Sequence, residues 1–345
     1  MPRTGLTNQS IGGNRVRAAT LALVSASACL LAGCTSGSAA ATPTTPTAYV
    51  VTGADIPNPG DTVAVVDTVT SRVQTPVTTG TLPAALVVTP DGRDVLVANK
   101  GYDTLSEIDV ATGKVVKDVT VGLEPDAVAV TPNGATALVA NFGDNTVTPV
   151  SLPALRAGRP IAVGRQPVAI AVSPRGDLAL VANYEDGTVS PIALPTLVVG
   201  PSVPAGLEPG AVFITPDSGT ALVADFQTSQ VTPIGLPAMT AGPAIAVGGN
   251  PTGIAGAPTS TTAYVSGGDS VTPIDWQTGR AGPAFPIGTT AEGLAIAPGG
   301  TTAWVCGGNG ALIHMSLDHG SVIGKVTVGG EPASVVIAAG HSASA

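Results

Sequence analysis

Polar side chains recur at one position of this sequence, and their spacing could gather oxygen atoms around a hard cation. The position precedes an anchoring proline or its equivalent, and six of its seven occupants are polar: Leu82, Glu124, Gln166, Glu208, Asn250, Thr290 and Glu331. Asp126 and Glu292 lie close by in the sequence. Calcium takes about 6 to 8 oxygen ligands. The candidate metal ligands are therefore Glu124, Glu208, Glu331, Asp126 and Glu292, and the other interpretation is a solvated rim on an acidic protein.

Aromatic residues form a second series. Phe142, Tyr184 and Phe226 stand at one register in three successive segments, Lys100 holds that register in the segment before, and Tyr102 is nearby. Exposed aromatic rings beside polar groups suit contact with a carbohydrate or a peptide. The candidate binding residues are Phe142, Tyr184, Phe226, Tyr102, Asn141, Asn183, Asp144 and Asp186. The alternative is that each ring covers an edge of the fold.

Catalytic constellations are missing from the sequence. The three histidines, His314, His319 and His341, are too scattered to indicate a transition-metal cluster. There is no Gly-x-Ser-x-Gly elbow, haem-attachment motif or phosphate loop. Lone carboxylates are the only candidates for acid-base chemistry and nothing pairs them, so no catalytic residue is assigned.

These residues must be positioned by a repeat. A glycine opens each unit at Gly80, Gly122, Gly164, Gly206, Gly248, Gly288 and Gly329, in steps of 42, 42, 42, 42, 40 and 41 residues. This period fits four short strands, the blade of a β-propeller. One column of the repeat is small in every unit (Ala85, Ala127, Ala169, Ala211, Gly253, Gly293, Ser334), as crowding near a propeller axis requires.

The two ends of the repeat are incomplete in complementary ways. The N-terminal unit starts with a second strand, Ala48–Val51, whereas Gly329–Ile337 is a first strand with nothing after it. The sequence therefore predicts an all-β, seven-bladed propeller of four-stranded blades in which the N- and C-terminal strands share one blade. The turn entering each blade and the loop between its second and third strands are expected on one face, called the top face.

The N-terminus indicates export. Arg3, Arg15 and Arg17 precede an apolar run over residues 18–31, too short for a membrane span. Leu31-Ala32-Gly33-Cys34 resembles a bacterial lipobox, which implies a lipid on Cys34 and a location on the extracytoplasmic face of the cell membrane. We expect a signal peptide over 1–33, a flexible Ser/Thr/Pro/Ala tether over 34–47, the propeller over 48–338 and a disordered tail over 339–345.

Charge limits the partners. The signal peptide removes three of 14 basic residues and none of the 23 acidic ones, so the mature chain carries 11 − 23 = −12. An acidic surface argues against nucleic acid and anionic lipid, and leaves the N-terminal lipid as the only predicted contact with a membrane. Only Cys306 remains besides the lipidated cysteine, so no internal disulfide is expected.

The units resemble the YVTN-type β-propeller repeats of bacterial and archaeal envelope proteins, a group that includes periplasmic YncE-like proteins. The resemblance covers nearly the whole mature chain and rests on Ala48-Tyr-Val-Val-Thr52, the Leu-Val-Ala-Asn copies that end at Asn99, Asn141 and Asn183, Ile108–Lys114 and Thr89–Gly92. It implies the fold and says little about function. Prolines in the third strands (Pro149, Pro191, Pro233, Pro273) depart from the family and must face an unbonded side or a bulge.

Three functions are open. The first is a monomeric, non-enzymatic, lipid-anchored propeller that binds a protein, peptide or glycan of the cell envelope through its top face. The second is a lactonase or hydrolase-type enzyme with a divalent cation, such as calcium, in the channel mouth. The third, a quinone-cofactor dehydrogenase, lacks supporting motifs.

Overall fold

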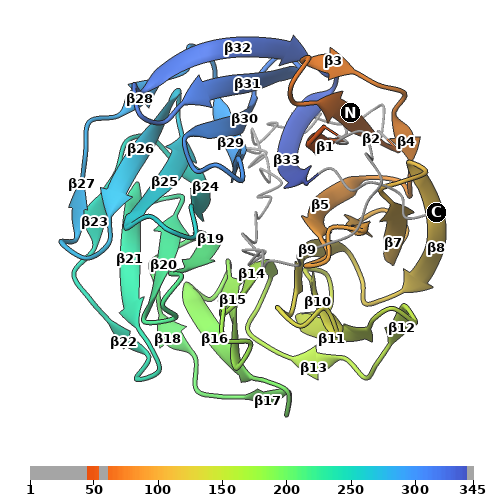
Figure 1. Ribbon diagram of the computed structural model, residues 1–345. Coiled ribbons are helices and arrows are strands. Elements are labelled where there is room, and N and C mark those ends of the chain that lie inside the picture. The colour runs from red at the N-terminus through yellow and green to blue at the C-terminus, as the bar shows by residue number, and fades with distance from the viewer. Residues whose placement is uncertain (1–44, 54–60, 340–345) are drawn as a thin grey trace, which may run out of the picture.

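Seven antiparallel sheets form a ring around a central axis (Figure 1). The structure is a computed structural model that describes residues 45–53 and 61–339. All regular elements in these ranges are strands, and no helix in them could span a membrane. The predicted signal peptide, Cys34, most of the tether and residues 340–345 lie outside the described residues. The predicted seven-bladed propeller of four-stranded blades is confirmed.

Each blade runs outward from an inner first strand to an outer fourth strand. Blade 1 contains β33 (Glu331–Ala338), β1 (Thr47–Gly53), β2 (Thr62–Asp67) and the outer pieces β3 (Arg72–Val73) and β4 (Val77–Thr78). Blade 2 contains β5 (Pro83–Val88), β6 (Asp94–Asn99), β7 (Thr104–Asp109) and β8 (Lys114–Thr120). Blade 3 contains β9 (Pro125–Val130), β10 (Thr136–Asn141), β11 (Thr146–Ser151), β12 (Arg156–Ala157) and β13 (Ile161–Ala162).

The remaining blades repeat this plan. Blade 4 contains β14 (Pro167–Val172), β15 (Leu178–Asn183), β16 (Thr188–Ala193), β17 (Val198–Val199) and β18 (Val203–Pro204), and blade 5 contains β19 (Pro209–Ile214), β20 (Thr220–Asp225), β21 (Gln230–Gly235), β22 (Thr240–Ala241) and β23 (Ile245–Ala246). Blade 6 contains β24 (Pro251–Gly256), β25 (Thr262–Gly267), β26 (Ser270–Asp275), β27 (Arg280–Ala281) and β28 (Phe285–Pro286), and blade 7 contains β29 (Ala291–Ile296), β30 (Thr302–Gly307), β31 (Ala311–Ser316) and β32 (Ser321–Thr327).

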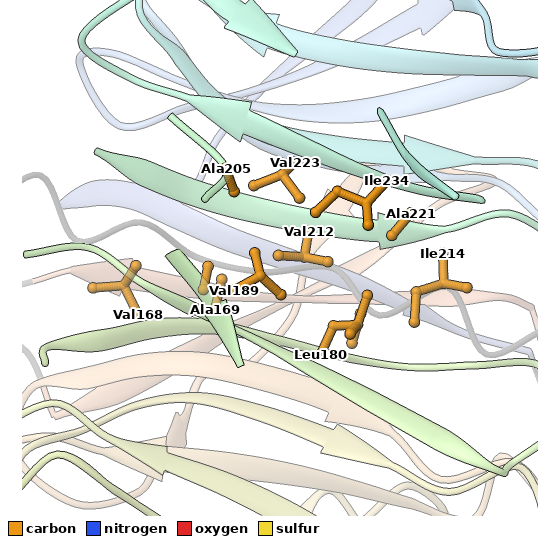
Figure 2. Close-up of a cluster of buried hydrophobic side chains, with 12 residues drawn as sticks. Val168, Ala169, Leu180, Val189, Ala205, Val212, Ile214, Ala221, Val223 and Ile234 are labelled. Carbon is orange, nitrogen blue, oxygen red and sulfur yellow. The ribbon is translucent and has the colours of Figure 1, made fainter. Parts of the chain in front are cut away.

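The core lies between neighbouring blades. Figure 2 shows one such layer, in which Leu180 and Val189 of blade 4 face Val212, Val223 and Ile234 of blade 5. Second strands are buried on both faces because each blade is sandwiched between two others, which is why they consist of apolar residues without alternation. Burial of these side chains is the main source of stability of the ring.

The ring closes through blade 1. β33 pairs with β1, with Val50 opposite Val335 and Thr47 opposite Ala338, so the last strand of the chain completes the first blade. This is the predicted arrangement of the two incomplete ends. It covers the inner edge that β1 would otherwise expose.

The third-strand prolines lie opposite an interruption of the outer strand. In blade 3, β11 pairs with β12 through Val150 and Ser151 and with β13 through Thr146 and Val147, which leaves Pro149 without a partner residue on that side. The Pro149 carbonyl accepts a hydrogen bond from the Gly158 amide instead. A proline there removes no hydrogen bond from the ladder, as its missing N–H requires. Blade 2 has Glu107 at this position and a continuous outer strand, β8.

The irregular steps of the repeat come from one loop. Between second and third strands the paired ends are Asn141 and Thr146 in blade 3, Gly267 and Ser270 in blade 6, and Gly307 and Ala311 in blade 7. The loops of blades 6 and 7 are therefore two residues and one residue shorter, which accounts for the steps of 40 and 41 residues. The variation in repeat length is thus located in the top-face loops.

Candidate functional site

The top face is built from two loops of each blade that are hydrogen-bonded to each other. The Phe142 amide donates to the Glu124 carbonyl, and the Gly143 amide donates to the Leu123 carbonyl. Equivalent bonds join Tyr184 to Gln166 and Phe226 to Glu208. The turn entering a blade and its second hairpin loop therefore share a face, as expected. The opposite, bottom face carries the turns after the first and third strands.

Asn141 holds these loops from inside the blade. Its side chain is fully buried, Oδ1 accepts a hydrogen bond of 3.2 Å from the Gly122 amide, and Nδ2 donates to Thr146 and Thr148 at 2.9 Å each. A Cβ at Gly122 would lie 2.5 Å from this side chain, so only glycine fits there. Asn183 is equally buried and donates to Thr188 and Ser190, but its Oδ1 has no partner among the described residues. Both predicted binding residues are thus inside the blades.

The hairpin residue that follows each buried asparagine contacts the next blade, and in blade 2 this residue is Lys100, which follows Asn99. Lys100 of blade 2 donates a 2.8 Å hydrogen bond from Nζ to Asp126 Oδ1 of blade 3 and lies 4.3 Å from the centroid of the Phe142 ring. Asp126 is only 2% exposed. Burial raises the pKa of Asp126, and the Lys100 ammonium opposes that shift.

Phe142, Tyr184 and Phe226 are half-buried at the same hairpin position. Phe142 and Tyr184 pack against the hydrophobic cluster between blades 4 and 5. Burial and a hydrogen bond with Glu208 raise the pKa of Tyr184 to about 12. The Phe226 carbonyl accepts a 3.0 Å hydrogen bond from Asn250 Nδ2 of blade 6. The rings of Phe142 and Tyr184 and the backbone of Phe226 therefore join neighbouring blades, and all three side chains are partly exposed.

Exposed apolar side chains complete this surface. Tyr102, Leu123 and Leu207 are 64%, 54% and 60% exposed. Leu123 and Leu207 directly follow the glycine that opens a unit, a column that the sequence analysis did not single out. A comparison of the units would have identified these two leucines, because the same position holds Gly249 in blade 6 and Thr289 in blade 7.

Arg165 occupies that column in blade 4 and is fixed by two carboxylates. Its Nε donates to Asp186 Oδ1 at 2.6 Å and its Nη1 donates to Glu185 Oε1 at 2.8 Å. The backbone amide of Arg165 also donates to Asp186, and this bond, with the guanidinium, lowers the pKa of Asp186. Asp144 similarly accepts a hydrogen bond from the Leu123 amide. The predicted residues Asp144 and Asp186 therefore support the exposed column.

The five predicted cation ligands fall into separate groups. Asp126 pairs with Lys100, while Glu208 accepts a 3.2 Å hydrogen bond from Gln227. Glu124 and Glu331 are exposed. Within residues 45–53 and 61–339, no three His, Cys, Asp or Glu side chains are grouped closely enough to hold a metal ion. The structure thus gives calcium no assembled set of ligands among these residues.

Glu292 is the counterpart of Asp126 in blade 7, one residue after the anchoring position. Burial, with a smaller contribution from the charge of Glu331, raises the pKa of Glu292 to about 7. Blade 6 has the short Gly267–Ser270 hairpin where blade 2 supplies Lys100. Among the described residues, Glu292 has no hydrogen bond or ion pair that would compensate its burial.

Comparisons with known proteins agree with the propeller. Residues 14–143 match the family described as YNCE-like beta-propeller, which confirms the resemblance to YncE-like proteins. A functionally unknown protein from Desulfotomaculum acetoxidans superimposes with a TM-score of 0.76 at 19% identity, covering 86% of this chain and 99% of that chain. Hydrazine synthase from Kuenenia stuttgartiensis superimposes with a TM-score of 0.68 at 20% identity, covering 74% of this chain and 90% of that chain.

A third structure, dihydro-heme d1 dehydrogenase NirN in complex with DHE, gives a TM-score of 0.61 at 16% identity and covers 86% of this chain and 76% of that chain. At such identities the likeness concerns the fold alone. No curated protein matches the sequence.

Proposed function

We propose that this propeller with a YncE-like region is a lipid-anchored binding module of the cell envelope that holds a polypeptide partner on the top face of blades 2 to 5. The observation that carries the proposal is the set of exposed apolar side chains Tyr102, Leu123 and Leu207, which lie on top-face loops of the blades that also carry the half-buried Phe142, Tyr184 and Phe226. Solvent-exposed apolar groups rimmed by charged residues mark interaction surfaces.

The asymmetry of the ring supports this choice of blades. Blades 2 to 5 have Lys100, Phe142, Tyr184 and Phe226 at the hairpin position, whereas blades 6 and 7 have Gly268 and Gly308. All blades need the same strands to build the ring, so this difference between top-face loops is not required by the fold. Function in a repeat protein resides in positions that differ between repeats.

A polypeptide suits the surface better than a glycan. Sugar rings stack on aromatic faces, but Leu123 and Leu207 offer branched aliphatic groups, which suit the side chains of a protein. Arg165, Glu185 and Asp186 supply charges of both signs between them. Such a mixture resembles the apolar centre and polar rim of a protein interface.

The anchor rests on the sequence Leu31-Ala32-Gly33-Cys34 at the end of an apolar run. A diacylglycerol on Cys34 would hold the propeller at the membrane surface through the tether. Replacing Cys34 by Ser should move the protein from the membrane fraction to the soluble fraction and abolish labelling with radioactive palmitate. A Cys34→Ser protein that remains labelled and membrane-bound would refute the lipid site without bearing on the top face.

The binding surface is tested with peptides selected from a displayed library on the immobilised protein without its lipid anchor, residues 35–345. The variant Tyr102→Ser/Leu123→Ser/Leu207→Ser should bind the selected peptides at least about tenfold more weakly, because apolar anchors dominate interface energies. Fluorescence polarisation measures the affinities. All three side chains are exposed, so unfolding should change by less than about 0.5 kcal/mol per site.

A matched control is provided by Val69→Ser/Val116→Ser/Val198→Ser, which removes three side chains that are 67%, 57% and 61% exposed away from the top face. The control should bind peptides as the wild type does. Equal losses in both variants, or no selection of peptides together with saturable binding of an envelope glycan, would overturn the proposal of a polypeptide partner.

A further inference from the structure

A groove of about 510 Å³ opens on the bottom face between blades 2 and 3. Blade 2 contributes the turn around Asp91 and Asp94 and the third-strand residue Glu107. Blade 3 contributes Asn133 and the Leu152-Pro153 turn. The groove therefore combines apolar walls with three carboxylates and one cation, Arg93, whose Nε lies 3.9 Å from Asp91 Oδ2. The proposed top-face function does not use it.

Glu107 is the unusual residue of this groove. It is 9% exposed, and the equivalent third-strand position is Pro149, Pro191, Pro233 or Pro273 in the next four blades. No hydrogen bond or salt bridge to the Glu107 carboxylate exists among the described residues. The residue is largely buried while its carboxylate oxygens keep contact with solvent, so partial burial disfavours the charged form and no partner in the described part of the chain compensates it. Its presence where proline would suffice requires an explanation.

The charges around Glu107 do not neutralise it. Burial raises the pKa of Glu107, the charges of Asp94 and Asp109 add to this, and Lys117 acts in the opposite direction. Lys117 lies opposite Glu107 in the β7–β8 ladder, but no hydrogen bond or salt bridge among the described residues joins the two side chains, and the Lys117 ammonium donates a hydrogen bond to the Ala154 carbonyl of blade 3. Burial also raises the pKa of Asp94, the charges of Asp91 and Asp109 add to this, and Arg93 acts in the opposite direction. The three carboxylates of the lining thus outnumber its one cation, Arg93, and the Glu107 carboxylate is an acceptor without a bonded partner among the described residues.

We propose that this groove binds an organic cation, a primary ammonium or guanidinium group, with Glu107 as its counter-ion and Asp94 beside it. A cation with an aliphatic stem would place its charge against the carboxylates and its methylene groups against Pro132, Leu152 and Pro153. The ligand is either a free amine or a basic side chain of another polypeptide, since both present the same chemistry.

An organic cation fits the geometry better than a metal ion. Calcium needs several oxygen atoms at about 2.3 to 2.6 Å from one point. Asp91, Asp94 and Glu107 are not among any group of three close enough to hold a metal ion within the described part of the chain. An ammonium or guanidinium group needs only two or three acceptors spread over its surface.

The internal contrast with blade 3 shows what pairing achieves. Asp126, also buried, is compensated by the ammonium of Lys100 at 2.8 Å. Glu107 has no such bond, although both carboxylates lie in the same pair of blades. A ligand ammonium in the groove would give Glu107 the kind of bond that Lys100 gives Asp126.

The test uses the mature protein and titration calorimetry at low ionic strength. The probes are 1,4-diaminobutane for a free amine and the N-acetyl amides of lysine and arginine for a side chain, with the N-acetyl amide of norleucine as the neutral control. At least one cationic probe should saturate, and Glu107→Gln should weaken it at least tenfold. Asp94→Asn should weaken it less.

Glu185→Gln is the matched control, because it removes one negative charge from an exposed position on the opposite face. It should bind the cations as the wild type does, and so should the top-face variant of Tyr102, Leu123 and Leu207. Glu107→Gln should also unfold at the same temperature as the wild type or higher. A failure of peptide binding at the top face would leave this result unchanged, so the two proposals are separable.

Any of four outcomes would overturn the proposal. The first is that no probe saturates, and the second is that the norleucine amide binds as well as the lysine amide. The third is that Glu107→Gln and Glu185→Gln weaken binding equally, which would indicate only general attraction of cations to an acidic protein. A marked fall in the unfolding temperature of Glu107→Gln would show that an internal partner already compensates the carboxylate. Saturation by diaminobutane alone or by the amino-acid amides alone would distinguish the two sources of ligand.

Discussion

At the scale of single residues, two carboxylates at equivalent positions of blades 3 and 7 differ in their partners. Asp126 receives an ammonium from the preceding blade, whereas Glu292 follows a blade whose hairpin is two residues shorter. Both residues were predicted as candidate cation ligands, because they lie close in the sequence to the column of polar residues. The sequence could not show which of them is neutralised, since that depends on how far the Lys100 side chain reaches.

Glu292 makes the stability of the protein depend on pH. Its pKa in the folded state is raised from 4.5 to about 7, so the folded state binds the proton more tightly than the unfolded state. The stabilisation is full below about pH 4.5 and is lost as pH rises through 7. The loss amounts to on the order of 3 kcal/mol, because each pKa unit corresponds to about 1.4 kcal/mol.

Urea unfolding at pH 5 and pH 8 measures this effect. Glu292→Gln should remove most of the difference between the two pH values and should unfold at higher urea concentration than the wild type at pH 8. Glu185→Gln, an exposed carboxylate, should retain the pH dependence of the wild type. The interpretation is wrong if Glu292→Gln is less stable than the wild type at pH 8.

At the scale of elements, the buried asparagines join the loops of a blade. Asn141 satisfies the Gly122 amide and two threonine hydroxyl groups, whereas Oδ1 of Asn183 satisfies no donor among the described residues. Asn141 and Asn183 were predicted as binding residues because they adjoin the aromatic series in the sequence. An exposed asparagine side chain and a buried one can both occur at the end of a strand, so the sequence does not distinguish them.

The two asparagines should therefore differ when they are removed. Asn141→Ala leaves the buried Gly122 N–H without an acceptor, which costs about 1 to 3 kcal/mol in addition to the lost side-chain bonds. Asn183→Ala leaves no such donor, so its cost should be smaller by about 1 kcal/mol or more. Chemical denaturation of the two variants measures the difference. Equal costs would show that the Asn141 Oδ1 bond contributes little to stability.

The effect of the third-strand prolines could be predicted from the sequence. The prolines of the third strands required an unbonded side, and they lie opposite the interruption between outer pieces such as β12 and β13. The reason is local, because a proline has no N–H wherever it stands. The exposed column that contains Leu123 and Leu207 was not predicted, because the glycine that recurs before it was interpreted only as a turn residue.

At the scale of the whole molecule, the period of the repeat was sufficient to predict the ring. Seven opening glycines and two incomplete ends leave one arrangement in which every blade has four strand positions. The groove between blades 2 and 3 could not be predicted in this way. It arises from the contact of the Glu107 side of blade 2 with the Leu152-Pro153 turn of blade 3, and no repeat length encodes that contact.

Closure by β33 should be essential for the ring. Deleting residues 331–339 removes the buried Val335 and Val336 and exposes the inner edge of β1. Unpaired edges associate, so we expect soluble oligomers or aggregates and an unfolding temperature lower by roughly 10 °C or more. Size-exclusion chromatography and thermal unfolding measure both effects.

A permuted chain is the control for this deletion. Residues 329–339 placed before residue 45 through a short turn would form a hairpin with β1, since Thr47 and Ala338 are already opposite each other. This chain should be monomeric and as stable as the wild type to within about 1 kcal/mol. A deletion variant that remains monomeric and stable would contradict an essential role of β33.

The pairing of β33 with β1 also means that blade 1 is completed last when the chain is synthesised. Synthesis proceeds from the N-terminus, so β1 and β2 emerge first and wait for an inner neighbour that emerges last, after all six other blades. A chain cut short at any point before β33 has the same unfilled place beside β1. A closed ring therefore shows that synthesis reached the last strand, β33, and every chain that ends before β33 has an accessible edge on β1.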